Sequence, residues 1–360
     1  LFPENESAPE FRADWQLLKG DPYYRRKHSV ESSMNHSESL IDIPDISDIH
    51  LAQARTRSLV RKTPVINDPG LDEVLGCRLY CKCENLQRTG AFKFRGASNA
   101  IARLQELGVE GDVATHSAGN HGAALALAAK LAGKTAHVVM PDNSSRMKIA
   151  AVRGYGGQVH FCEPNHASRA AGLDELIAKG NTAVHPYDHP DIISGQGTAA
   201  LELEQEVPSL EQVITPLGGG GLVSGTAIAT RSWGVDVYAV EPEGAADTVQ
   251  SLEQGHIAED YVTDTIADGL RAIVGVRNFK VICDSVQQVL TVSDADIRAA
   301  MILFWRKLKM TIEPSSATVI AALRNHPEIF AGRKVGAVIT GGNIHPSEWL
   351  AVSGEQPPES

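Results

Sequence analysis

The chain has 360 residues, of which 42% are hydrophobic and 21% charged, and its formal net charge is -11 at pH 7. A chain of this length and composition can bury one large core or two medium ones, which excludes a disordered or fibrous protein. The acidic balance argues against binding to nucleic acid or to an anionic membrane, because both need clustered Lys and Arg. We therefore expect the partners to be small molecules.

The cysteines and the polar ends of the chain indicate the cellular compartment of the protein. Five cysteines, an odd number without a paired framework, favour a reduced intracellular setting. No apolar run approaches the ~20 residues that cross a bilayer, and the start of the chain lacks the apolar segment of a signal peptide. We expect a cytoplasmic protein, with an extension of unknown role at residues 1–40 and a polar tail at 351–360.

The predicted elements begin with an amphipathic helix at 49–60, which ends before Thr63-Pro64. Strand and helix then alternate four times, at 79–83 with 96–106, 113–116 with 119–132, 136–140 with 145–153, and 158–162 with 167–179. After residue 191 the predicted elements are a helix at 197–206, a strand at 212–216, a helix at 222–231, and strands at 235–240 and 334–339. This alternation predicts an α/β fold, with parallel strands covered by helices on both faces.

A run of four glycines, Gly218 to Gly221, lies between a predicted strand and a predicted helix. Without side chains, such a loop can bring several backbone N–H groups onto one anion at the positive end of the helix. No Gly-Lys-Ser/Thr follows, as in a Walker loop, and the glycine spacing is wrong for a dinucleotide. We predict a phosphate site; the alternative is a plain turn, and the run alone names no reaction.

Two further segments carry reactive or polar groups. Lys93 lies between two phenylalanines at the start of a helix, where apolar neighbours and the cations Arg88 or Arg95 would lower its pKa toward that of a Schiff-base amine. Taken alone, a surface lysine is the commoner outcome. The segment His116-Ser-Ala-Gly-Asn-His-Gly precedes another helix and suits a carboxylate, although a helix cap explains its Ser and Asn equally well.

Along the chain, the Lys93 segment comes first, then the segment that begins at His116, then the four glycines and finally Thr340-Gly-Gly-Asn. This combination resembles the fold type II pyridoxal 5′-phosphate (PLP) enzymes. Within them the chain is similar to the threonine dehydratase, serine dehydratase and serine racemase group, from about residue 45 to 345. The resemblance implies a tryptophan synthase β-like fold of two three-layer α/β domains with open, twisted, mostly parallel sheets. Residues 41–85 and 191–350 would form the large PLP-binding domain, and residues 86–190, mainly 113–190, the small substrate-loop domain.

The same resemblance implies the site residues. Lys93 would be the catalytic residue that carries PLP as a Schiff base. The implied cofactor-binding residues are Phe92, Lys93, Asn120, Gly218, Gly219, Gly220, Gly221, Leu222, Gly269, Glu313 and Thr340. The implied substrate-binding residues are Ser117, Ala118, Gly119, Asn120 and His121. A Mg²⁺ or Ca²⁺ site is implied at Glu241, Ala245 and Asp247, with an acidic surface turn as the alternative.

The activity implied is that of an ammonia-lyase, or dehydratase, which converts a small L-β-hydroxy amino acid such as L-threonine or L-serine to the 2-oxo acid and ammonia by α,β-elimination. Serine racemases carry a serine where this chain has Ala118, so racemisation is expected to be weak. The alternatives are a serine racemase, and a 3-hydroxyaspartate ammonia-lyase that would use Arg169 or Arg271 for the second carboxylate. A non-catalytic PLP or amino-acid binding protein is the alternative from another class. A homodimer or homotetramer is expected.

Overall fold

The computed structural model describes residues 41–117, 119–259, 261 and 263–353. The predicted extension at 1–40, Ala118 and the end of the predicted tail lie outside these residues. The larger of two sheets has the strand order β1 (Val65–Ile66), β2 (Arg78–Lys82), β10 (Lys334–Val338), β7 (Gln212–Pro216), β8 (Asp236–Pro242) and β9 (Gln288–Val292). The smaller sheet has the order β5 (Gln158–Cys162), β4 (Ala136–Pro141), β3 (Val113–His116) and β6 (Thr182–Ala183). Among the strand pairs of the described residues, all are parallel except the edge pair β1 and β2, so the prediction of mostly parallel sheets is confirmed.

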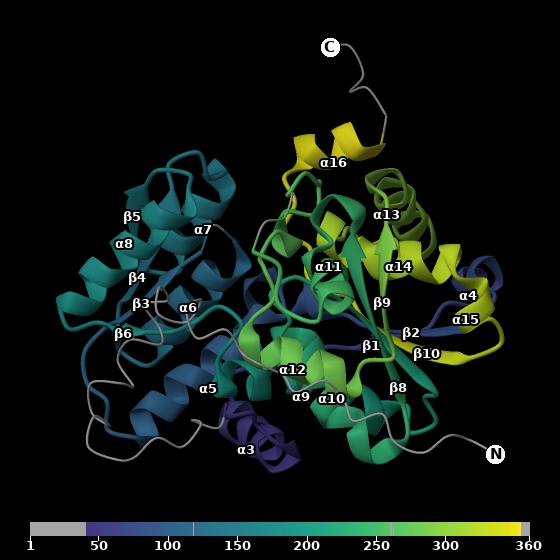
Figure 1. The fold of residues 1–360 in the computed structure, drawn as a ribbon, viewed down its shortest axis with the longest axis horizontal. Coiled ribbons are helices and arrows are strands. Elements are labelled where there is room, and N and C mark those ends of the chain that lie inside the picture. The colour runs from purple at the N-terminus through teal and green to yellow at the C-terminus, as the bar shows by residue number, and fades with distance from the viewer. Residues whose placement is uncertain (1–40, 118, 260, 262, 354–360) are drawn as a thin grey trace.

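Helices surround both sheets, which lie side by side in Figure 1. The α-helices are α3 (Ile46–Thr56), α4 (Pro69–Leu75), α5 (Lys93–Glu106), α6 (Asn120–Leu131), α7 (Arg146–Gly154), α8 (His166–Ala178), α9 (Pro190–Glu206), α10 (Gly221–Thr230), α11 (Asp247–Gln254), α12 (Val276–Ser285), α13 (Asp294–Leu308), α14 (Pro314–Asn325), α15 (Pro327–Phe330) and α16 (Pro346–Ser353). The 3₁₀ helices are η1 (Glu84–Leu86), η2 (Arg88–Gly90), η3 (Arg231–Trp233), η4 (Glu243–Ala245) and η5 (Asp268–Leu270). In the described part of the chain, no helix has the length and apolar character needed to cross a bilayer.

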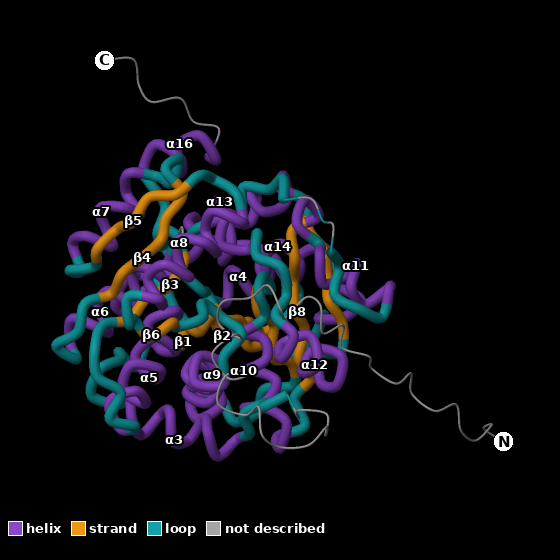
Figure 2. The backbone as a smooth tube through the Cα atoms, turned by 60° about the vertical axis from the view of Figure 1, so that its left-hand side comes forward, coloured by secondary structure: helices purple, strands orange, loops and turns teal. Residues whose placement is uncertain are grey.

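Alternation along the strands explains why helices cover both faces of each sheet (Figure 2). In β8, Val237 and Ala239 pack into the cluster that contains residues of α10 and α12, whereas Val240 packs into the cluster of α13 and α14. In β4, Val138 faces α6 and Val139 faces α8. Each sheet is therefore the middle layer of three.

Helices α5 and α9 cross closely because glycines face each other. A Cβ atom on Gly195 would lie 2.6 Å from the Cα of Gly96, and one on Gly96 would lie 2.9 Å from the carbonyl oxygen of Ile192. The helices predicted at 96–106 and 197–206 begin earlier, at Lys93 and Pro190, and the position of Lys93 at the start of a helix is confirmed. Gly96 and Gly195 lie inside these helices, where the close crossing leaves no room for a side chain.

Candidate functional site

Lys93 is the first residue of α5, and its amine is enclosed by apolar groups. Nζ donates to the carbonyl oxygen of Pro186 at 2.9 Å and lies 5.1 Å from the ring centroid of Phe92 and 6.0 Å from that of Tyr187. Burial lowers the pKa of Lys93 to about 8. The low pKa expected from the sequence is confirmed with burial as its cause, whereas the charge of Arg95 is neutralised by two glutamates.

The four glycines form a buried loop between β7 and the start of α10. The N–H groups of Gly218, Gly219 and Gly220 donate to no group among the described residues, although all three glycines are buried. Gly220 has a φ of +90°, and Leu222 is buried in the first turn of α10. Unpaired, buried N–H donors at a helix N-terminus fit a phosphate group, since the anion would satisfy them.

Tyr187 connects the glycine loop with Lys93, and the sequence analysis did not assign it a role. A Cβ atom on Gly219 would lie 2.3 Å from the Tyr187 ring, so the ring rests directly on this glycine. The segment is fixed by His185, whose Nδ1 accepts from the N–H groups of Tyr187 and Asp188 at 3.2 and 2.8 Å. The motif His-Pro-Tyr-Asp was visible in the sequence, but its position over the loop was not.

The end of β10 meets the start of α5. The N–H of Phe92 donates to the carbonyl oxygen of Thr340 at 2.9 Å, which places Thr340 next to the Lys93 segment. The hydroxyls of Thr340 and Ser316 are hydrogen-bonded at 2.8 Å, and Ser316 also accepts from the N–H of Gly341 at 2.7 Å. Thr340 therefore presents an uncharged hydroxyl, held in place by a serine that the sequence analysis did not single out.

Asn120 belongs to a network that joins segments far apart in the chain. Its Nδ2 donates to the Glu313 carboxylate at 2.9 and 3.2 Å, and its Oδ1 accepts from Asn343 Nδ2 at 2.8 Å. Burial raises the pKa of Glu313. The predicted residues Asn120 and Glu313 thus touch each other, and Asn343 joins them.

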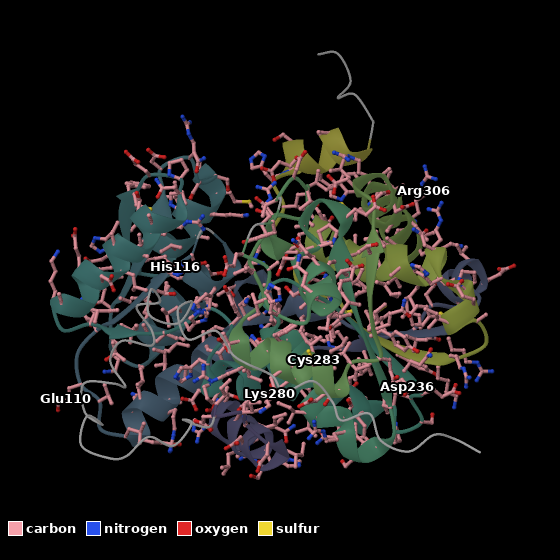
Figure 3. The ribbon with its side chains drawn as sticks, viewed as in Figure 1. Glu110, His116, Asp236, Lys280, Cys283 and Arg306 are labelled. Carbon is pink, nitrogen blue, oxygen red and sulfur yellow. The ribbon has the colours of Figure 1, made fainter. Side chains whose placement is uncertain are left out.

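The predicted substrate loop follows His116, the last residue of β3, which is labelled in Figure 3. Ser117 Oγ accepts from the N–H groups of Gly119 and Gly122, both at 3.2 Å, as in a helix cap, and its own proton is donated to no other described residue. Burial lowers the pKa of His121 to about 3, so its imidazole is neutral. The space beside Gly119 is open, because a Cβ there would meet no atom within 4 Å.

Gly269 lies in η5, against the glycine loop. A Cβ atom on Gly218 would lie 3.4 Å from the Gly269 carbonyl oxygen, and the Gly269 N–H donates to Ser315 Oγ at 3.1 Å. The neighbouring Asp268 is ion-paired with Lys148 of α7. Segments from both sheets therefore converge around Lys93 and the glycine loop.

The predicted metal-site residues are buried, which argues against an acidic surface turn. Glu241 is 0% exposed at the end of β8, and Asp247 is 1% exposed at the start of α11. Burial, together with the charge of Asp247, raises the pKa of Glu241 to about 8, and burial raises that of Asp247 to about 6. Asp247 Oδ1 accepts no hydrogen bond from the described residues. No cluster of three or more His, Cys, Asp or Glu in the described part of the chain could hold a metal, so a cation here would need carbonyl or water ligands beside the two carboxylates.

Arg169 and Arg271 are both bonded to the backbone of their own segments. Arg169 Nε donates to the Asn165 carbonyl at 3.3 Å, and Arg271 Nε to the Thr265 carbonyl at 3.2 Å. The structure therefore singles out neither arginine as a receiver of a second carboxylate.

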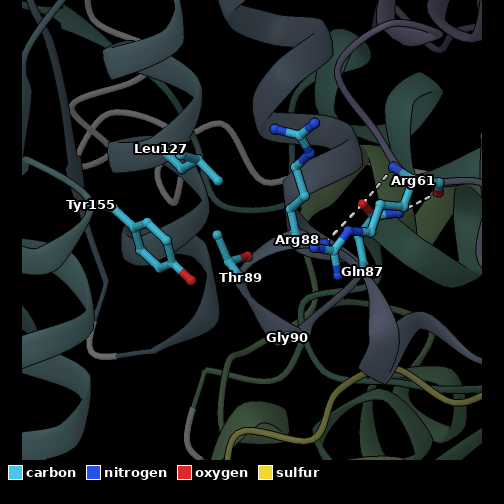
Figure 4. Close-up of a pocket in the computed structure, with 7 residues that line it drawn as sticks. All are labelled: Arg61, Gln87, Arg88, Thr89, Gly90, Leu127 and Tyr155. Atoms are coloured by element: carbon cyan, nitrogen blue, oxygen red, sulfur yellow. Dashed lines mark hydrogen bonds between the residues drawn. The ribbon is translucent and has the colours of Figure 1, made fainter.

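A cavity of about 370 Å³ lies beside the residues that precede Lys93 (Figure 4). Its lining residues are Arg61, Gln87, Arg88, Thr89, Gly90, Leu127 and Tyr155. Thr89 has a φ of +63°, and its carbonyl accepts from Asn343 Nδ2 at 2.8 Å. The cavity thus borders the Asn120 network but contains none of the predicted site residues.

Comparison with known proteins identifies the class of enzyme. The family described as pyridoxal-phosphate dependent enzyme matches residues 56–341. The beta-hydroxyaspartate dehydratase of Paracoccus denitrificans is 41% identical over 305 residues, which cover 84% of this chain and 97% of that protein. The serine racemase of Dictyostelium discoideum is 42% identical over 309 residues, or 83% and 94% of the two chains. The structure of maize serine racemase aligns with a TM-score of 0.83 at 39% identity and covers 87% and 98% of the two chains.

The chain therefore belongs to the family of pyridoxal-phosphate dependent enzymes. This confirms the predicted family, the fold type II architecture and PLP as the cofactor. The roles of the individual site residues stay predictions.

Proposed function

We propose that this protein is a PLP-dependent ammonia-lyase that removes the hydroxyl and the amino group of a small L-β-hydroxy amino acid and releases a 2-oxo acid and ammonia. The observation that carries the proposal is the partly buried amine of Lys93, with a pKa of about 8, in the same site as a loop of unpaired N–H donors. When bound, PLP supplies the electron sink that this elimination needs.

Lys93 would bind the cofactor covalently and act as the base at the α-carbon. At a pKa of about 8, about a quarter of the amine is neutral at pH 7.5, against roughly 0.1% at the ordinary value of 10.5. A base whose pKa lies close to the working pH transfers protons efficiently in both directions. The Pro186 carbonyl, which accepts from Nζ, would direct the amine.

Two other groups would hold the cofactor by their hydrogen-bonding chemistry. The N–H groups of Gly218 to Gly220 would bind its phosphate, and the Thr340 hydroxyl would face its ring nitrogen. A hydroxyl fixed by Ser316 carries no charge and does not stabilise a protonated ring nitrogen. Loss of the β-hydroxyl is then favoured over transamination.

The loop of Ser117 to His121 would bind the substrate carboxylate. It precedes the N-terminus of α6, where backbone N–H groups attract an anion. The hydroxyl proton of Ser117 is available to the same carboxylate. Residue 118 is alanine, which has no proton to transfer to the second face of the α-carbon, so we propose elimination over racemisation.

A 3-hydroxyaspartate ammonia-lyase is the second candidate. It is favoured by the Paracoccus relative, whose name specifies beta-hydroxyaspartate. We further propose that Glu241 and Asp247, with the carbonyl of Ala245, bind Mg²⁺ or Ca²⁺, supported by the unpartnered, buried Asp247 Oδ1. A homodimer or homotetramer in the cytoplasm is also proposed; the five free cysteines suit that compartment.

The test is 2-oxo acid release from L-threonine, L-serine, D-serine and the 3-hydroxyaspartates, each with and without Mg²⁺, combined with chiral analysis of the remaining amino acid. We expect turnover of an L-β-hydroxy amino acid with little epimerisation, and no turnover by Lys93→Ala. Rapid formation of D-serine would contradict elimination as the main reaction. Borohydride reduction followed by peptide mapping must place the pyridoxyl label on Lys93, and a label elsewhere would refute its assigned role.

A further inference from the structure

Four buried charged side chains surround the first turn of α5. We call them the buried charge cluster, and they are Lys82, Glu84, Arg95 and Glu202. The Arg95 guanidinium donates to Glu84 through Nε and Nη2, both at 2.8 Å, and to Glu202 through Nη1 at 2.9 Å and Nη2 at 2.7 Å. Lys82 Nζ lies 2.8 Å from Glu202 Oε2. Two cations and two anions therefore balance, with at most 9% of any of these side chains exposed.

Stability alone does not account for such a cluster. Removing four charges from water is costly, and well-packed apolar residues of similar volume are often as stable or more stable. What a fork of charge-assisted hydrogen bonds adds is direction, because the guanidinium fixes both carboxylates in one plane. The cluster thus constrains the geometry of the segments that it joins.

The constrained segment is the one that begins with Lys93. Arg95 lies two residues further along α5, so the two side chains leave the helix about 200° apart, on opposite sides. Phe92, at the N-cap position, provides no side-chain hydrogen bond to the helix end. The ammonium of Lys93 also lies at the positive end of the helix dipole, which disfavours this turn.

The cluster anchors this uncapped turn through a side chain. Glu84 begins η1, two residues after the end of β2, and Glu202 lies on α9, so Arg95 ties the first turn of α5 to the end of a strand of the larger sheet and to a neighbouring helix. The Thr198 hydroxyl, also on α9, accepts from Arg95 Nη1 at 3.1 Å. One residue further on, the N–H of Gly96 donates to Gln196 Oε1 at 3.2 Å at the close crossing of α5 and α9.

We propose that the buried charge cluster is a positioning device for Lys93: through Arg95 it holds the first turn of α5 in place from the side opposite to the amine. Arg95 is thus a positioning residue, since it touches neither cofactor nor substrate. The inference rests on the proposed function, in which Lys93 carries the cofactor.

The test compares Arg95→Met and Arg95→Lys with Arg55→Met. Arg55 is a matched control because it also anchors α5, donating to Asn99 at 2.6 Å and to Glu106 at 2.8 Å, but at later turns of the helix. The readouts are kcat and KM for the preferred substrate and the rate at which the visible band of lysine-bound PLP appears after PLP is added to cofactor-free protein. The second readout follows attachment to Lys93 without any turnover.

For Arg95→Met we expect kcat to fall about 100-fold, as for an angstrom-scale displacement of a reacting group, with less than about a threefold change in KM. PLP attachment should slow in parallel. Arg95→Lys keeps the charge but not the fork, and should lose about tenfold in kcat. Arg55→Met should keep wild-type values of both.

A fourfold variant separates positioning from stability. In Lys82→Met/Glu84→Leu/Arg95→Met/Glu202→Leu no buried charge is left unpaired, so thermal stability should return close to that of the wild type while kcat stays as low as in Arg95→Met. Recovery of kcat in the fourfold variant would overturn the inference, and so would a wild-type kcat in Arg95→Lys. If the other variants do not fold, the kcat of Arg95→Lys alone tests the inference. If borohydride labels Lys93 in every variant and both kcat and the rate of PLP attachment equal those of the wild type, the inference is refuted and the proposed function stands. If the label lies on another residue, the proposed function itself is refuted.

Discussion

Replacing Lys93 should make the cofactor-free protein more stable, although it abolishes activity. A pKa of about 8 in place of 10.5 means that, at pH 7, the partly buried ammonium costs the folded state roughly 3 kcal/mol. Lys93→Met removes this cost and leaves the Pro186 carbonyl without its donor, which costs about 1 kcal/mol. The net gain is about 2 kcal/mol, or about 3 °C in Tm for a chain of this size.

The gain should depend on pH in a defined direction. Between pH 8 and 10.5 the unfolded lysine is still protonated and the folded one is not, so wild-type stability rises relative to Lys93→Met across this window. The free energy of unfolding of Lys93→Met should exceed that of the wild type by about 2 kcal/mol at pH 7 and by less than about 0.5 kcal/mol at pH 9.5. Scanning calorimetry of both cofactor-free proteins at one concentration measures it, with the exposed Lys130→Met as control. A less stable Lys93→Met at pH 7, or a difference that does not change with pH, would refute a desolvated amine.

Two further predictions concern the other predicted sites. Gly219→Ala should weaken PLP binding at least tenfold in equilibrium titrations, because the new Cβ would lie 2.3 Å from the Tyr187 ring; Gly154→Ala, with no atom within 4 Å, is the control. Millimolar Mg²⁺ should raise the Tm at pH 8 and much less at pH 5, since Asp247 and Glu241 have pKa values raised to about 6 and 8 and bind a cation only when ionised. Asp247→Asn should lose this effect, and an equal response to Mg²⁺ in that variant would exclude the metal site.

The features that the sequence predicted correctly depend on residues close together in the chain. The strands at 113–116, 158–162 and 212–216 lie where their apolar patterns placed them, because each is bounded by polar or turn-forming residues. The starts of α5 and α9 were not predicted correctly, because they depend on a contact between segments that are far apart in the chain. Their glycines interrupt the helical pattern locally and are explained only by a helix crossing that brings Gly96 and Gly195 together.

The candidate site was predictable in its parts but not in its contacts. The network of Asn120, Glu313 and Asn343 joins residues that are 193 and 223 positions apart, which no local pattern encodes. The enclosure of Lys93 likewise depends on Pro186 and Tyr187, from a separate segment. Burial of Glu241 and Asp247, which argues against a surface turn, was visible only once the fold was known, and the metal site stays a prediction. The predicted domain boundaries stay predictions.

The strand order of the larger sheet has a consequence for how the chain is made. β2 pairs with β10, and Arg78 lies opposite Lys334, 256 residues later. During synthesis one edge of β2 therefore stays without its partner until residues 334–338 have left the ribosome. The smaller sheet draws all four strands from residues 113–183 and can form much earlier. Loop closure over such a distance is slow, so the nascent chain exposes an aggregation-prone strand edge at least while the residues between β2 and β10 are being made.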